Sequence, residues 1–383
     1  MNEKFSKELI NKTFSYPFKE ENFSNFSNEM FDNIDLSQSS NWISNTLIPT
    51  NIKENIDQYK ILGTKEDQNN GLITVLMVKF SNKFTVERSR NIQREFAKWI
   101  LNKLESDACL IAFFAENYDD WRFSFVNIDY KREKNKAGKI KAVETLSSLK
   151  RFSFLVGKNE PNYTAQAQLS PLLLDENKNP SIEKLKEAFS IEKVNKEFFE
   201  NYKSLCFKIK DEIDQLLKID HNLKKEFLNK KIISFEYSKK FMAQMIFIFF
   251  LQKKGWMGIK NKNKSIDTNL GPKNFIFNLF DKDYRDYNNF YNDILEPLFY
   301  EGLSKKTENN YFKFLNCKLP FFNISLFEPI NNYDWKGTQI KIKNSTIEDL
   351  LDKFKRFNFT VNEEQDLDQE IAVDPEMLGK VLE

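Results

Sequence analysis

The chain has 383 residues, of which 40% are hydrophobic and 30% are charged, and its formal net charge is only +2. This length predicts two to three domains with substantial cores. The near balance of charge excludes a chain that binds nucleic acid as a whole-molecule polycation, so any nucleic-acid surface must be a local patch.

Histidine and cysteine usage excludes several kinds of active site. The single histidine, His221, leaves almost no room for Ser-His-Asp or Cys-His catalysis, and we expect it to be an exposed side chain in a polar helical stretch. The three cysteines are far apart and form no CxxC pair, which argues against a zinc site and fits a reducing compartment. Because the N-terminus also lacks the apolar core of a signal peptide, we expect a cytoplasmic protein without a membrane partner.

An α/β unit is predicted in the first third of the chain, after irregular or short helical pieces in residues 1–55. Alternating β-branched and aromatic residues predict strands, and one long amphipathic stretch predicts a helix. The predicted strands are Asp57–Thr64, Leu72–Phe80, Ala108–Ala115 and Trp121–Ile128, with a helix at Thr85–Leu104 between the second and the third. Residues 150–169 return to strand-like alternation, and residues 170–181 are predicted to be a linker because they contain two prolines.

Basic residues gather at three places that could contact DNA phosphates. These candidates are Arg88, Arg90 and Arg94 along the predicted helix, Lys131, Arg132 and Lys134 in a basic loop, and Lys253 and Lys254 at the end of a later helix. Each group can equally be a solvated face of the protein, so both interpretations stay open at this point.

From Ser181 onward the pattern favours helices. The stretch Ser238–Trp256 is the most apolar in the chain and predicts a buried core helix, which is too short to cross a bilayer. Further helices are predicted at Phe275–Leu303 and Thr346–Phe357, with an extended segment at Leu319–Pro329 between them. The expected fold class is therefore α/β plus α-helical.

Six stretches resemble one protein family, and they occur in that family's order. They are DDWRFSFV (119–126), KRFSFLVG (150–157), LKEAFSIEKVNKEFFENY (185–202), FFLQKKGW (249–256), LPFFNISLFEP (319–329) and the segment from Phe357 to Glu383. Together they resemble the N-terminal portion of type IIG restriction–modification enzymes, which join an endonuclease-like region, a helical region and an adenine-specific DNA methyltransferase. The chain departs from the family at Ile324 and Ser325, where two glycines are usual.

The resemblance implies a domain plan and a DNA partner. Residues 1–170 would form a restriction-endonuclease-like α/β domain, residues 171–310 a helical domain, and residues 311–383 a run-in to a methyltransferase domain. The sequence contains neither the Gly-rich loop that approaches S-adenosylmethionine nor an NPPY-like motif, so we expect a chain truncated before that domain, with the cofactor bound in the missing part. The alternative is a non-catalytic module that docks onto a separately encoded methyltransferase or specificity subunit through the acidic tail Glu363–Glu376.

The resemblance also implies a PD-(D/E)xK nuclease site, which needs two acids for Mg²⁺ and a lysine near the attacking water. Lys79 is the plausible lysine, but Met77 stands where the second acid is expected. A hairpin turn would pair Lys79 with about Lys60 and bring Asp57 close, whereas Asp67 would lie at the opposite end. Asp57 and Lys79 are therefore the candidate catalytic residues, with Asp57 the candidate metal ligand. The missing acid favours a nuclease-like fold without cleavage.

Overall fold

The computed structural model describes residues 2–81, 86, 89–128, 149–260, 270–360 and 368–373, together with the backbone of 131–134 and 140–143. Two compact units account for the chain. The first comprises Met1–Val194, Arg356–Asn358 and Glu364–Ala372, and the second comprises Asn195–Lys355, Phe359–Glu363 and Val373–Glu383. The first unit therefore extends beyond the boundary expected at residue 170, and the sequence from 311 to 355 belongs with the helices of the second unit.

A seven-stranded mixed sheet organises the first unit, with the strand order β1-β2-β3-β4-β5-β8-β11. Its strands are β1 (Ile43–Ser44), β2 (Ile56–Glu66), β3 (Leu72–Phe80), β4 (Ala108–Phe114), β5 (Asp120–Ile128), β8 (Leu149–Gly157) and β11 (Asp368–Glu370). The pairs β3–β4 and β8–β11 are parallel, and the other pairs are antiparallel. The expected β-β-α-β-β order is confirmed, because the α4 helix connects the parallel strands β3 and β4.

Helices surround this sheet in the first unit. They are α1 (Glu3–Phe14), α2 (Glu20–Met30), α3 (Thr50–Lys53), α4 (Arg90–Leu104), α5 (Tyr163–Leu174) and α6 (Ile182–Ala188). On one face, Phe96 and Ile100 of α4 share a hydrophobic core with Leu76 and Ile111 of the central strands. That face therefore takes every second side chain of β3 and β4.

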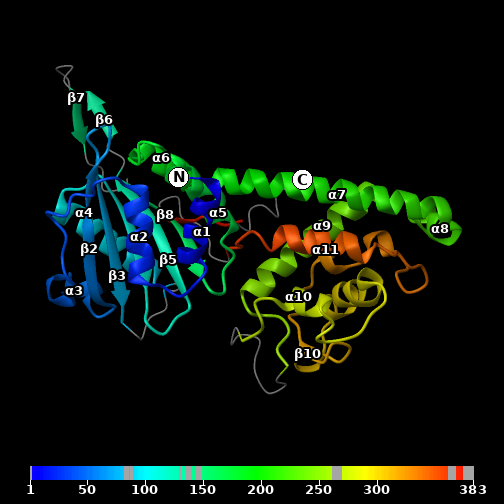
Figure 1. The fold of residues 1–383 in the computed structure, drawn as a ribbon. Coiled ribbons are helices and arrows are strands. Elements are labelled where there is room, and N and C mark those ends of the chain that lie inside the picture. The colour runs from blue at the N-terminus through cyan, green and yellow to red at the C-terminus, as the bar shows by residue number, and fades with distance from the viewer. Residues whose placement is uncertain are drawn as a thin grey trace. The chain divides into compact units, whose positions relative to one another are not determined.

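The opposite face carries aromatic side chains. Figure 1 shows α1 and α2 lying over the sheet on this side. The ring of Phe14 in α1 lies 5.3 Å from the rings of Trp121 and Phe123 in β5, measured between centroids. Since Trp121 and Phe123 point to this face, Arg122 between them points to the α4 face.

The prediction of a linker at residues 170–181 is wrong for its first half. The helix α5 contains Pro171 and runs on to Leu174. It persists because Leu169, Leu172 and Leu173 are buried, and because the Ser170 hydroxyl lies 3.0 Å from a hydroxyl of α1. Tertiary packing thus outweighs the cost of a proline inside a helix.

The second unit is mainly helical. Its α-helices are α7 (Ile191–Ile219), α8 (His221–Asn229), α9 (Ser234–Lys253), α10 (Phe275–Phe280) and α11 (Asn344–Phe354), and α7 starts in the first unit. Two π-helical segments span Tyr291–Leu295 and Leu298–Leu303. A small antiparallel pair is formed by β9 (Tyr311–Phe312) and β10 (Cys317–Lys318). The predicted buried helix is confirmed as α9, which ends where Gly255 adopts a positive φ of 69°. The helix predicted at Phe275–Leu303 is interrupted, because α10 stops at Phe280 and helical structure resumes only at Phe290.

Candidate functional site

Lys79 and two carboxylates meet at one end of the sheet in the first unit. Lys79 is the second-last residue of β3, Asp57 stands at the start of β2, and Glu116 follows the end of β4. The ammonium Nζ of Lys79 lies 3.0 Å from a carboxylate oxygen of Glu116 and 3.4 Å from one of Asp57. The two acids are open to solvent, with side chains 63% and 52% exposed, while the lysine is only 15% exposed.

The charge of Lys79 is fixed by these neighbours. Partial burial lowers the pKa of Lys79, but its interactions with Glu116 and then Asp57 raise it by more, so the pKa lies above its usual value. The side chain is therefore a permanent cation at neutral pH and cannot act as a general base. It can orient an anion or stabilise developing negative charge.

The donor set fits a magnesium ion bound through few protein ligands. Mg²⁺ prefers oxygen ligands and commonly keeps several waters, with one or two carboxylates and substrate phosphates completing its shell. The exposed carboxylates of Asp57 and Glu116 offer two such ligands. Within the described part of the chain, no group of three or more acidic, histidine or cysteine side chains is placed to hold a metal. Water and phosphate oxygens would have to supply the remaining ligands.

The strand register differs from the expected one by two residues. Lys79 pairs with Gln58, and Lys60 pairs with Met77. One residue of the difference arises because Glu66 pairs with Leu72, which centres the turn on Asn69, and the other arises at the irregularity between Ile61 and Gly63. The expected proximity of Asp57 to Lys79 is nevertheless present. Asp67 lies in the turn, where its carboxylate accepts hydrogen bonds from backbone N–H groups and so has a structural role.

Glu116 is the site residue that the sequence analysis missed. The expected pattern places the second acid on the same strand as the lysine, two residues before it, where Met77 is wholly buried. The structure instead brings an acid from the neighbouring strand, because β3 and β4 are parallel and both end at this edge. Carboxyl ends of parallel strands are a usual place for functional residues. The sequence signal that could have identified Glu116 is its position directly after the predicted strand Ala108–Ala115, the second strand of a β-α-β unit.

Of the three arginines predicted to contact DNA, the structure describes Arg90 and Arg94, and neither is fully exposed. Arg90 is the first residue of α4, its side chain is only 14% exposed, and its Nη2 atom lies 3.6 Å from a carboxylate oxygen of Glu370. Arg94 is half-buried. Arg88 lies outside the described residues. A DNA contact through these arginines remains a prediction.

The predicted basic loop forms a hairpin instead. Residues 131–134 and 140–143 pair as the antiparallel strands β6 (Lys131–Lys134) and β7 (Ile140–Val143). The side chains of Lys131, Arg132 and Lys134 lie outside the description, so their contact with DNA stays a prediction.

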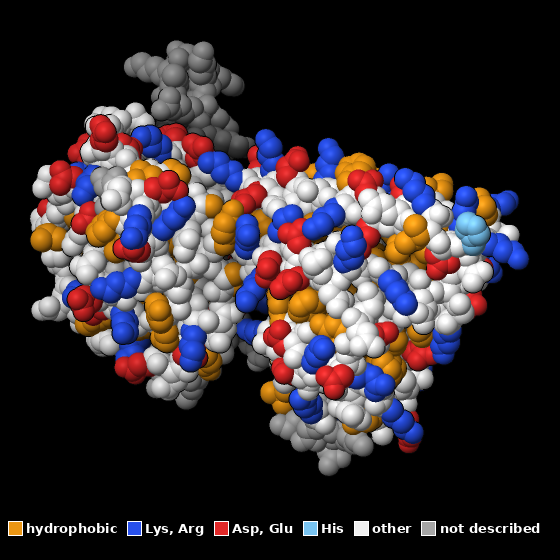
Figure 2. Space-filling view, turned by 45° about the vertical axis from the view of Figure 1, so that its right-hand side comes forward, with side chains coloured by type: hydrophobic (Ala, Val, Ile, Leu, Met, Phe, Trp, Pro, Cys, Tyr) orange, Lys and Arg blue, Asp and Glu red, His pale blue; other side chains and the backbone are white. Residues whose placement is uncertain are grey.

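The remaining predicted DNA contacts, Lys253 and Lys254, end α9. The Nζ atom of Lys254 lies 4.6 Å from the ring centroid of Trp256, so the ammonium group has a partner within this chain. Figure 2 shows acidic and basic side chains intermixed over the face in view, so the figure adds no single-sign patch in support of these contacts.

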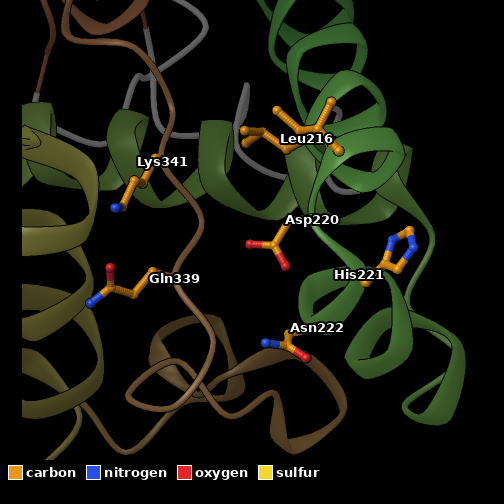
Figure 3. Close-up of a pocket in the computed structure, with 7 residues that line it drawn as sticks. Leu216, Asp220, His221, Asn222, Gln339 and Lys341 are labelled. Carbon is orange, nitrogen blue, oxygen red and sulfur yellow. The ribbon is translucent and has the colours of Figure 1, made fainter.

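His221 lies at a shallow pocket of about 470 Å³ in the second unit. It is exposed, as predicted. Its neighbour Asp220 caps α8 by accepting a hydrogen bond of 3.0 Å from the backbone N–H of Leu223. Figure 3 shows the Asp220 carboxylate pointing into the pocket and the His221 imidazole on the other side, facing away. The pair is therefore not arranged as an acid–base couple.

The acidic tail that would dock onto a methyltransferase subunit is partly used within the first unit. Asp368 and Glu370 belong to β11, where their carboxylates bind Arg151 and Arg122. These two acids are unavailable to another protein while β11 stays in the sheet. Residues 363–367 and 374–376 lie outside the described residues.

Comparison with known proteins identifies no relative. No family model matches the sequence, and neither a curated protein nor a solved structure is significantly similar to it. No helix among the described residues is long and apolar enough to cross a membrane. A functional proposal therefore depends on the sequence motifs and on the geometry at Lys79.

Proposed function

We propose that this chain corresponds to the N-terminal, DNA-processing portion of a type IIG-like restriction–modification enzyme. Within it, Asp57, Lys79 and Glu116 form a metal-dependent nuclease site. The observation that carries the proposal is the placement of Lys79 between two exposed carboxylates at the carboxyl end of the parallel pair β3–β4. Two acids and a lysine are the groups that phosphodiester hydrolysis of this kind requires. The ordered motif resemblance supports DNA as the substrate.

Each residue has a distinct task in this proposal. Asp57 and Glu116 supply the oxygen ligands for a divalent cation and leave the rest of its coordination shell to water and to the phosphate. A bound Mg²⁺ would polarise a phosphate oxygen and lower the pKa of a bound water. Lys79, which keeps its proton at neutral pH, donates hydrogen bonds to the phosphate or to the attacking water and so stabilises negative charge as it develops.

Cleavage of supercoiled plasmid in Mg²⁺ or Mn²⁺ tests the proposal. We expect nicking by the unaltered chain and a loss of about 100-fold in Lys79→Ala, because one preorganised electrostatic group is removed. The matched control is Lys60→Ala, which also removes an ion-paired lysine of the β2–β3 hairpin, here one bound to Glu20 at 2.7 Å. Cleavage that survives Lys79→Ala, or that falls equally in both variants, would reject the assignment.

The alternative of a non-catalytic docking module has less support. It relies on the acidic tail, and the described part of that tail places Asp368 and Glu370 in the sheet of this same chain. Co-purification with a methyltransferase subunit that disappears when residues 361–383 are deleted, in a protein that does not cleave DNA, would favour this alternative.

A further inference from the structure

Two copies of one short motif build a polar site on the α4 face of the sheet. The sequence Arg-Phe-Ser-Phe occurs in β5, beginning at Arg122, and again in the antiparallel neighbour β8, beginning at Arg151. The register places Ser124 directly opposite Ser153. Since side chains alternate along a strand, both arginines and both serines point to the same face.

The strand β11 fills this site with two carboxylates. Both oxygens of Asp368 accept hydrogen bonds from Arg151, at 2.8 to 3.1 Å. One oxygen of Glu370 accepts two hydrogen bonds from Arg122, each 3.2 Å long, and lies 3.6 Å from Arg90 of α4. The side chains of Arg122 and Arg151 are wholly buried.

The donors exceed the acceptors at this site. In the described part of the chain, three arginines face the two carboxylates of β11. The side-chain oxygens of Gln93 and Ser153 each accept one further hydrogen bond, from Arg151 and Arg122 respectively. Four buried polar atoms there have no hydrogen-bond partner: Nε and Nη2 of Arg90, Nε of Arg122 and Oγ of Ser124. A buried donor without a partner is costly, so the site can accept more anionic oxygen atoms than β11 supplies.

We propose that Arg90, Arg122, Ser124, Arg151 and Ser153 form a phosphate-binding site, and that β11 is a built-in acidic strand that occupies it in the absence of phosphate. A phosphate group offers more oxygen atoms than a carboxylate. It also matches the fork of arginine donors, with the hydroxyls of Ser124 and Ser153 as further partners. The unpaired atoms are those that the additional oxygens would take.

Release of β11 is compatible with the way in which it is held. It is an edge strand that pairs through only three residues, parallel to β8. Its position depends on ion pairs as well as on burial of Ile371 and Ala372. Buried arginines left without an anion are strongly destabilising, so β11 leaves only if another anion replaces it. The site therefore exchanges one anion for another.

Thermal unfolding of the full chain in inorganic phosphate, compared with sodium chloride at equal ionic strength, tests the proposal. The variant Asp368→Asn/Glu370→Gln keeps the shape of both side chains but removes the competing charges. We expect phosphate to raise the midpoint of this variant far more than that of the unaltered chain, with an apparent Kd at least about tenfold tighter. The matched control, Glu29→Gln/Asp175→Asn, removes two acids from surface ion pairs of the same unit and should behave like the unaltered chain.

A single variant covers the case in which the double variant does not fold. Glu370→Gln leaves the pair between Asp368 and Arg151 intact and should show the same preference for phosphate, and adding Arg122→Gln should abolish it. Equal stabilisation by phosphate and chloride in every folded variant would overturn the proposal. So would equal phosphate stabilisation in the variants and the unaltered chain.

A short DNA duplex as a second probe distinguishes the source of the phosphate group. Tighter duplex binding in Glu370→Gln together with phosphate-specific stabilisation indicates DNA backbone phosphate, and this arm rests on the proposed function. Stabilisation by inorganic phosphate alone indicates a free phosphate or a small phosphorylated ligand. Both results are independent of the nuclease site, because Lys79 lies on the opposite face of the sheet from the arginines.

Discussion

At the scale of single residues, Glu296 has an environment that imposes a dependence of stability on pH. It is wholly buried in the second unit, where its carboxyl group accepts hydrogen bonds from Asn292 at 2.8 Å and from Tyr237 at 3.4 Å. Burial raises the pKa of Glu296 well above its ordinary value, and these two hydrogen bonds offset that effect only in part. The folded protein therefore holds this proton more tightly than the unfolded chain.

Because the folded state holds this proton more tightly, the second unit loses stability as the pH rises. Below the unfolded pKa both states are protonated and the stability is complete, and it falls as the pH rises toward the folded pKa. We predict that the free energy of unfolding of the second unit decreases by up to about 1.4 kcal/mol per pH unit above pH 5 through this group. Glu296→Gln should remove that slope and be the more stable protein at pH 8. Urea unfolding at several pH values measures this, and identical slopes in the two proteins would contradict it.

At the scale of elements, α9 carries the core of the second unit. It is apolar on all sides, as expected of a helix surrounded by others. Phe241 is almost wholly buried, with its ring 5.0 Å from the ring of Tyr291, whereas Phe247 two turns later is only half-buried. Burial, not position on the helix, should decide what each aromatic side chain contributes.

A comparison of these two phenylalanines tests that statement. Phe241→Ala should lower the free energy of unfolding by about 3–5 kcal/mol, because it leaves a cavity in a packed core. Phe247→Ala removes the same atoms from the same helix and should cost clearly less. Chemical denaturation followed by circular dichroism gives both values. Equal losses would show that burial does not decide what these two side chains contribute.

Local patterns predict the elements whose partners lie nearby in the sequence. The strands of the β2–β3 hairpin and the buried helix α9 follow from alternation and from an apolar run. By contrast, β11 is not predictable in this way, since Asp368 and Glu370 are charged and become buried only because Arg151 and Arg122, more than 200 residues earlier, neutralise them. Glu116 is missed for a different reason, because it joins Lys79 only through the parallel pairing of β3 with β4.

At the scale of the whole molecule, the nuclease candidate and the arginine–serine site both belong to the first unit, on opposite faces of one sheet. The first unit also takes in Glu364–Ala372, from late in the chain, because β11 pairs with β8. The small net charge of +2 fits a protein that contacts DNA through local groups and not through its overall field. In the proposed metal site, Glu116 takes the place of the carboxylate that is missing at Met77.

Binding of Mn²⁺ to the full chain, followed by electron paramagnetic resonance, tests this role of Glu116, because Mn²⁺ accepts the same oxygen ligands as Mg²⁺. Glu66, an exposed acid at the far end of β2 from Asp57, provides the control Glu66→Gln. We expect one Mn²⁺ site of equal affinity in the unaltered chain and the control, and an affinity at least about tenfold weaker in Glu116→Gln and in Asp57→Asn. Unchanged Mn²⁺ affinity in Glu116→Gln would contradict it.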